Sequence, residues 1–134
     1  MKYILFLIVL ISFNRVNGQN NMIITDVQSE ITNKKWTAQP SNPNALYFFF
    51  KKNEVSLIVA GDFINDTAYY FAEFEEVQNT EFSEEQIGRN SSGNYVVTFN
   101  DIFEIQLYED RKSFRMQSIM KGKDNWQRYY LMED

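Results

Sequence analysis

The side chains best suited to acid–base catalysis or metal binding in this sequence are glutamates that lie close together in the chain. They are Glu73, Glu75, Glu76, Glu81, Glu84 and Glu85. Paired carboxylates can hydrolyse glycosides by acid–base chemistry or bind calcium. The segment has neither the Asp-x-Asp-x-Asp-Gly pattern of a calcium loop nor a spacing that marks a catalytic pair. We therefore expect these glutamates to form a solvated surface whose charge discourages strand pairing.

The residue types that perform most enzyme chemistry are missing from the chain. The sequence contains no histidine and no cysteine, which removes the commonest general base, the thiol nucleophiles and the usual zinc ligands. It also lacks a glycine-rich phosphate loop and a Gly-x-Ser-x-Gly motif. We expect a protein that is not an enzyme, with no catalytic residues, no metal site, no cofactor and no disulfide.

Large apolar side chains are the remaining functional candidates. A ligand pocket is mostly apolar, and methionine adapts to irregular shapes. The side chains that we predict to turn inward, and thus to bind a ligand, are Phe48, Leu57, Phe71, Phe103, Ile105, Phe114, Met116 and Tyr130. The same residues can instead form a solid core, and the sequence leaves both alternatives open.

These candidates must be positioned by strands, because apolar and polar residues alternate through the second half of the chain. The alternating runs are Tyr95–Tyr108, Ser113–Met120 and Trp126–Met132, and Asn100-Asp101 divides the first run into two strands. A period of two is what a half-buried antiparallel strand requires. The short turn-prone segments between the runs predict that neighbouring strands pair as a meander.

The first half of the chain predicts further strands and one helix. The predicted strands are Asn33–Ala38, Ala45–Lys51, Glu54–Ala60 and Thr67–Glu76. Apolar residues at helical spacing predict a short amphipathic helix within Asn20–Thr32. Loops are expected at Gly61–Asp66 and Gln78–Gly93, the second with a capping-box pattern at Ser83 and Gln86 and one short helical turn.

About eight strands without a long helix predict an all-β fold. We expect an antiparallel up-and-down β-barrel with a short N-terminal helix, because closure of the sheet removes its unpaired edges. An eight-stranded barrel has an interior that side chains fill or that holds one small ligand.

Residues 1–18 have the pattern of a secretory signal peptide. Lys2 precedes an apolar core at Ile4–Phe13, and Val16 and Gly18 occupy the −3 and −1 positions of a cleavage site. The apolar core is too short to span a membrane. We predict a signal peptide at 1–18, a single β-barrel domain at 19–134 and a secreted or periplasmic protein. Its net charge of −5 disfavours binding to nucleic acid or anionic lipid, because phosphates repel an acidic surface.

The sequence resembles the lipocalin-like secreted proteins at two positions. In that family a tryptophan lies in the first strand soon after a short helical segment, as Trp36 does in Asn33-Lys34-Lys35-Trp36. The family also has an arginine on the last strand that packs over this tryptophan, and Arg128 stands at the similar position here. The resemblance implies a ligand-carrying barrel with Trp36 and Arg128 as a structural pair. Considered as a residue alone, Arg128 either stacks on this ring or points to solvent.

The sequence is compatible with two functions, and for both we expect a monomer. The first is a non-catalytic binding protein for a small hydrophobic ligand, with Gly61–Asp66 and Gln78–Gly93 as lids. The second is a protein-interaction or inhibitor module that uses the barrel as a scaffold for a protein partner. Its candidate surface is the acidic segment Glu73–Glu85 with exposed Phe63, Phe74 and Phe82.

Overall fold

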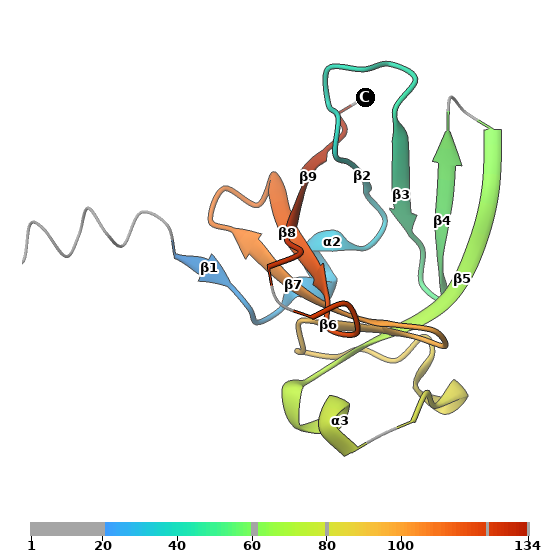
Figure 1. Cartoon of the computed structure of the whole chain (residues 1–134), viewed down its shortest axis with the longest axis vertical. Helices are drawn as coiled ribbons and strands as arrows, with labels where there is room; N and C mark the ends of the chain where they lie inside the picture. The colour runs from blue at the N-terminus through green and yellow to red at the C-terminus, as the bar shows by residue number, and fades with distance from the viewer. Residues whose placement is uncertain (1–20, 60–61, 80, 123, 134) are drawn as a thin grey trace, which may run out of the picture.

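The protein folds as one antiparallel sheet that curls into a half-barrel (Figure 1). This computed structural model describes residues 21–59, 62–79, 81–122 and 124–133. The signal peptide predicted at 1–18 lies outside the described residues. Within the described ranges the sheet has nine strands, and the helical segments are short. None of these helices is both long and apolar enough to cross a membrane.

The strand order confirms the predicted antiparallel meander. The strands are β1 (Met22–Ile23), β2 (Lys35–Thr37), β3 (Leu46–Phe50), β4 (Glu54–Val59), β5 (Asp62–Ala72), β6 (Tyr95–Thr98), β7 (Ile102–Tyr108), β8 (Ser113–Ser118) and β9 (Gln127–Leu131). From β2 to β9, each strand pairs with the next one along the chain, and β9 also pairs with β2. In Figure 1, β3, β4 and the start of β5 stand side by side, and β5 then curves away to join β6.

The prediction of a loop at Gly61–Asp66 is wrong, because β5 begins at Asp62. Val59 pairs with Asp62 and Leu57 pairs with Asn65, with a register shift between Leu57 and Ile58. Asparagine and aspartate are poor strand formers in general, but strand preference depends strongly on context. Asn65 and Asp66 are exposed, so β5 gains the backbone pairing with β4 without burying their polar side chains.

The prediction that a strand runs to Glu76 is also wrong, because β5 ends at Ala72 and helix α3 (Phe74–Asn79) follows. Val77 of α3 packs against a second apolar cluster on the outer face of the sheet, formed by Tyr70, Ala72 and Val97. The next segment, which contains the 3-10 turn η2 (Glu84–Gln86), adds apolar side chains to the same cluster. Helix α3 and the segment that contains η2 thus cover this outer cluster.

One short helical turn was expected after Ser83, and η2 confirms it, although Ser83 makes no side-chain capping hydrogen bond. The chain then returns to β6 through a close passage at Gly93. A Cβ atom at Gly93 would lie 1.9 Å from the carbonyl oxygen of Ala72, which no side chain can tolerate. Glycine is required at this position for the backbone to pass the end of β5.

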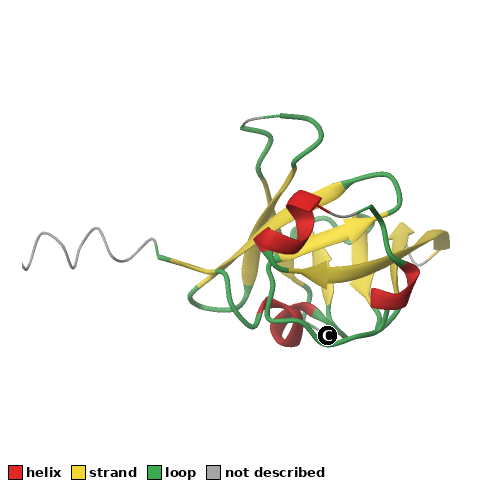
Figure 2. Ribbon diagram, turned by 90° about the horizontal axis from the view of Figure 1, so that it is seen from below, coloured by secondary structure: helices red, strands yellow, loops and turns green. Residues whose placement is uncertain are grey.

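The segment Asn20–Thr32, which predicts an amphipathic helix, contains β1 and the single-turn helix α2 (Val27–Ile31). Val27 and Ile31 of α2 are fully buried and contact the inner face of the sheet. The Ile31 carbonyl accepts a hydrogen bond of 3.0 Å from the Trp36 indole nitrogen. Figure 2 shows the short helices around the margin of the curled strands.

Candidate ligand pocket

The inward side chains of the sheet change in character from one end of the strands to the other. On β5, Asn65 and Thr67 line a pocket, whereas Tyr69 and Phe71 belong to the buried core. All four lie on one face, because side chains two residues apart point the same way in a strand. The same strand therefore contributes short polar side chains to one end of the interior and large rings to the other.

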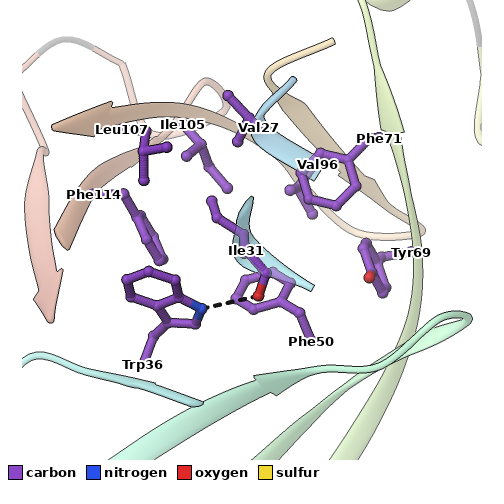
Figure 3. Packing of buried hydrophobic residues seen from close by; sticks show 10 residues of the cluster. All are labelled: Val27, Ile31, Trp36, Phe50, Tyr69, Phe71, Val96, Ile105, Leu107 and Phe114. Atoms are coloured by element: carbon purple, nitrogen blue, oxygen red, sulfur yellow. Dashed lines mark hydrogen bonds between the residues drawn. The ribbon is translucent and has the colours of Figure 1, made fainter. Parts of the chain in front are cut away.

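At the packed end, helix α2 and the aromatic side chains fill the interior. Trp36 is fully buried, and its ring meets that of Phe114 edge-on at 4.9 Å (Figure 3). Phe50 lies 6.3 Å from Phe114 and 5.8 Å from Tyr69, measured between ring centroids. The full cluster is Val27, Ile31, Trp36, Phe50, Tyr69, Phe71, Val96, Ile105, Leu107 and Phe114.

At the opposite end the interior holds a pocket of about 360 Å³ that is partly open to solvent. This volume falls within the range of small-molecule sites. The pocket's apolar side chains come from five strands and are Phe48, Phe50, Val96, Phe103, Met116 and Tyr129. Its polar side chains are Asn65, Thr67, Thr98, Asn100 and Asp101.

Asp101 is held in place by the hairpin that it belongs to and by β8. One carboxylate oxygen accepts a hydrogen bond of 2.7 Å from the Ile102 backbone nitrogen, and both lie 2.8 Å from the hydroxyl oxygen of Ser118. The backbone carbonyl of Asp101 also accepts from the Thr98 hydroxyl at 2.8 Å. These contacts fix a carboxylate beside an apolar surface, and no salt bridge to Asp101 occurs within the described part of the chain.

The predicted ligand-binding residues divide between the pocket and the core. Phe48, Phe103 and Met116 line the pocket. Phe71, Ile105 and Phe114 are buried in the packed cluster. The side chain of Leu57, on β4, is not among those that the structure describes. The two alternatives for the interior, solid core or pocket, thus both occur, at opposite ends of one sheet.

We expect Tyr130 to point inward from the sequence, but Tyr129 lines the pocket instead, and alternation along β9 therefore puts Tyr130 on the outer face. Its neighbour Tyr129 points inward, where its ring lies 5.3 Å from that of Phe48 and 5.4 Å from that of Phe114. Because the two tyrosines are adjacent and equally apolar, the sequence pattern alone does not show which of them faces the interior. The strand's other inward residue, Leu131, packs against the core and sets the phase that puts Tyr129 inside.

Arg128 shares the outer face with Tyr130, so its aromatic partners differ from the expected Trp36. Its guanidinium lies 3.8 Å from the ring centroid of Tyr108 and 5.0 Å from that of Tyr130. It also donates a hydrogen bond of 2.8 Å to the Ser113 hydroxyl. Trp36 is enclosed on the other side of the sheet, where it contacts Phe114 and Ile31. The pairing implied by the family resemblance does not form.

Sequence reasoning missed the polar part of the pocket. Asn65 and Thr67 lie on the segment around the wrongly predicted loop, and Asp101 lies in a turn, where polar residues are expected for local reasons. The available signal was the period of two in Asn65, Thr67, Tyr69 and Phe71, which places all four on one face once β5 is known to be continuous. Burial also raises the pKa of the inward phenols Tyr69 and Tyr129.

The acidic segment forms a separate surface around α3 and η2. Its glutamates Glu73, Glu75, Glu76, Glu81, Glu84 and Glu85 are exposed. Phe74 is 53% exposed, and Phe82 contacts Phe99, which is 79% exposed. Phe63, which was also assigned to this surface, lies where side chains are not described. Among the described residues no group of three or more acidic side chains is arranged to hold a metal ion.

A second depression, of about 460 Å³, lies between α2 and the segment before β6. It is lined by polar residues alone, among them Asp26, Gln28 and Asn90. The Gln28 side chain bridges its two sides, donating to the Arg89 carbonyl at 3.2 Å and accepting from the Ser91 backbone nitrogen at 2.5 Å. Without apolar walls it is a poorer candidate for a small-molecule site than the interior pocket.

In comparisons with family models, with curated proteins and with solved structures, no match to this chain is found.

Proposed function

We propose that this protein binds a small, mainly apolar molecule in the pocket formed by Phe48, Phe103, Met116 and Tyr129. The observation that supports this function is the pocket itself, about 360 Å³ in volume and apolar on its inner walls. A solid core would have placed large side chains at the Thr67 and Thr98 positions, which are inward-facing. The function is non-catalytic carriage, with no cofactor.

The proposal includes closure of the half-barrel into an eight-stranded, lipocalin-like barrel. Its support is the pairing of β9 with both β8 and β2, together with the pairing of β7 with β8. We place the entrance of the pocket at Asn65, Thr67 and Asn100, because these lining residues are exposed. A secreted or periplasmic location, implied by the signal-like residues 1–18, would give such a carrier access to ligands outside the cytoplasm.

The test is a pair of matched substitutions on neighbouring residues of β5. Thr67 lines the pocket, whereas Ala68 is exposed on the opposite face of the same strand. We expect Thr67→Trp to fill the entrance and weaken binding of a fluorescent apolar probe by tenfold or more, while Ala68→Trp leaves the affinity unchanged. Titration of the probe by fluorescence anisotropy measures both. Equal binding by the two variants, or no probe binding by the parent protein, would contradict the proposed function.

A second candidate function is recognition of a cationic protein by the acidic surface around α3. The observation that favours it is the exposure of Phe74 and Phe99 beside that surface, since aromatic side chains supply much of the binding energy at interfaces. A peptide with alternating lysine and aromatic residues is the probe. We expect Phe74→Ser with Phe99→Ser to lower its affinity tenfold in 0.15 M salt. If the double variant binds the peptide with unchanged affinity, the two aromatic side chains do not contribute to binding, and this candidate function is contradicted.

A further inference from the structure

The polar side chains of the pocket restrict the kind of ligand that it accepts. Among the described residues that line it, none is lysine or arginine, and one, Asp101, is a carboxylate. A ligand carboxylate would therefore enter an apolar site that offers no cation and already contains a negative charge. Burying a charge without a partner is costly, and a like charge beside it adds to the cost.

Asp101 has unused capacity to accept hydrogen bonds. A carboxylate has about four lone-pair sites on its two oxygens. The Ile102 backbone nitrogen uses one of them, and the Ser118 hydroxyl donates its single hydrogen to one oxygen at a time. Lys121, on the β8–β9 turn, contacts the Ser118 hydroxyl through its backbone nitrogen, and its ammonium forms no described salt bridge with Asp101. The carboxylate of Asp101 is thus fixed by hydrogen bonds, and it forms no salt bridge with any of the described residues.

The remaining polar groups are compatible with a hydrogen-bond donor on the ligand. Asn65 and Asn100 each present an amide oxygen, and Thr67 and Thr98 each present a hydroxyl oxygen. The neutral ring of Tyr129 lies among the apolar walls, and an aromatic face attracts a cation. The volume of about 360 Å³ accommodates about twelve water-sized groups, taking about 30 Å³ for each.

We infer that the ligand is an amphiphilic amine, whose protonated nitrogen pairs with Asp101 while its apolar body contacts Phe48, Phe103 and Met116. This inference rests on the proposed function and adds the chemical class of the ligand. It distinguishes the pocket from one built for fatty acids, which requires a basic or strongly donating group for the carboxylate.

The test compares three ligands that share a ten-carbon chain and differ in the head group: decylammonium, decan-1-ol and decanoate. Affinities are measured by isothermal titration calorimetry on the purified protein at pH 7 in 0.15 M salt, where long-range charge effects are screened. We expect decylammonium to bind at least tenfold more tightly than decan-1-ol, and decanoate to bind most weakly. Decan-1-ol binding without a preference for the amine would overturn the inference and leave the proposed function standing. Failure of all three to bind would overturn both.

Two asparagine variants locate the source of the preference. Asp101→Asn keeps an acceptor for the Ile102 nitrogen and removes the charge, so decylammonium affinity should fall to that of decan-1-ol. Asp110→Asn is the matched control, because Asp110 accepts from the Lys112 backbone nitrogen in the turn at the other end of β7. It removes the same charge away from the pocket and should leave the preference intact. A preference that survives Asp101→Asn, or that Asp110→Asn removes equally, would show that Asp101 does not recognise the amine; circular dichroism establishes that both variants are folded.

Discussion

The two ends of the interior differ in what the same strands place there. At the packed end, Trp36 and Phe114 meet edge-on within a cluster of buried side chains that includes Val27 and Ile31 of α2. At the open end the smaller inward side chains of Thr67, Thr98 and Met116 stand beside the rings of Phe48 and Phe103, and a pocket results. The packed end has the buried core, and the open end has the pocket.

This difference arises along individual strands. On β8 the inward residues run from Phe114 through Met116 to Ser118, and on β5 they run from Phe71 to Asn65. Side-chain volume and apolar character both decrease in the same direction on the two strands. An apolar interior is stabilising where it is filled to close packing, and a cavity lowers the stability. The protein therefore keeps its cavity where polar side chains can contact water.

The largest expected effect comes from shortening one inward residue at each end of β8. Phe114→Ala removes a fully buried ring from the packed cluster and should lower the free energy of unfolding by about 3–5 kcal/mol. Met116→Ala, two residues away, widens a pocket that is already open and should cost only about 1–2 kcal/mol, because Met116 is half-buried. Chemical denaturation followed by circular dichroism measures both. Equal losses would mean that the two ends are packed alike.

The packed end could be predicted from the sequence more fully than the open end. Alternation identified Phe71, Ile105 and Phe114 as inward, because each is a large apolar residue in a run with a clear period of two. At the open end, Asn65 and Asp101 have the composition of turns, and local propensity does not reveal that they also line a cavity. Whether a cavity remains depends on the volumes of side chains that meet from five strands, which no single run of sequence specifies.

A second prediction applies one substitution, threonine to valine, at two sites. Thr37, beside Trp36, is 2% exposed, and its hydroxyl donates to the Leu46 carbonyl at 2.9 Å and accepts from the Gln39 backbone nitrogen at 3.1 Å. Thr37→Val should cost about 1–2 kcal/mol, because it removes the hydroxyl that bonds both the Leu46 carbonyl and the Gln39 backbone nitrogen, two part-buried groups. Thr67 is exposed at the pocket and its hydroxyl has no described hydrogen bond, so Thr67→Val should change the free energy of unfolding by about 0.5 kcal/mol or less.

The valine pair is compared by urea denaturation under the same conditions as the parent protein. Thr67→Val also makes the pocket wall more apolar, so the affinity for a neutral apolar probe should rise or stay constant. A large loss of stability from Thr67→Val would mean that the open end contributes to the core as the packed end does, and the contrast between the two ends would fail.

The smallest expected effect is a loss of stability in alkali that originates from the inward phenols. Burial raises the pKa of Tyr69 above its ordinary value near 10, so the folded protein retains a proton that the unfolded chain releases. Its contribution is fully present below about pH 10 and is lost as the pH rises above that value. At pH 11 the loss is on the order of 1 kcal/mol, given by the ratio of ionised to neutral phenol in the unfolded chain. Burial raises the pKa of Tyr129 as well, but this residue lines the open pocket.

Denaturation midpoints at pH 8 and pH 11 for the parent, Tyr69→Phe and Tyr129→Phe test which end is responsible. Tyr69→Phe removes the hydrogen bond to the Lys51 carbonyl and is less stable at both pH values, so the informative quantity is the difference between them. The parent protein should lose stability between pH 8 and pH 11. We expect Tyr69→Phe to reduce this loss clearly and Tyr129→Phe to reduce it less, because water reaches the pocket and not the packed cluster. If Tyr129→Phe reduces the alkaline loss of stability more than Tyr69→Phe does, water reaches the pocket less than it reaches the packed cluster. That result would contradict the view that the pocket is the more solvated end.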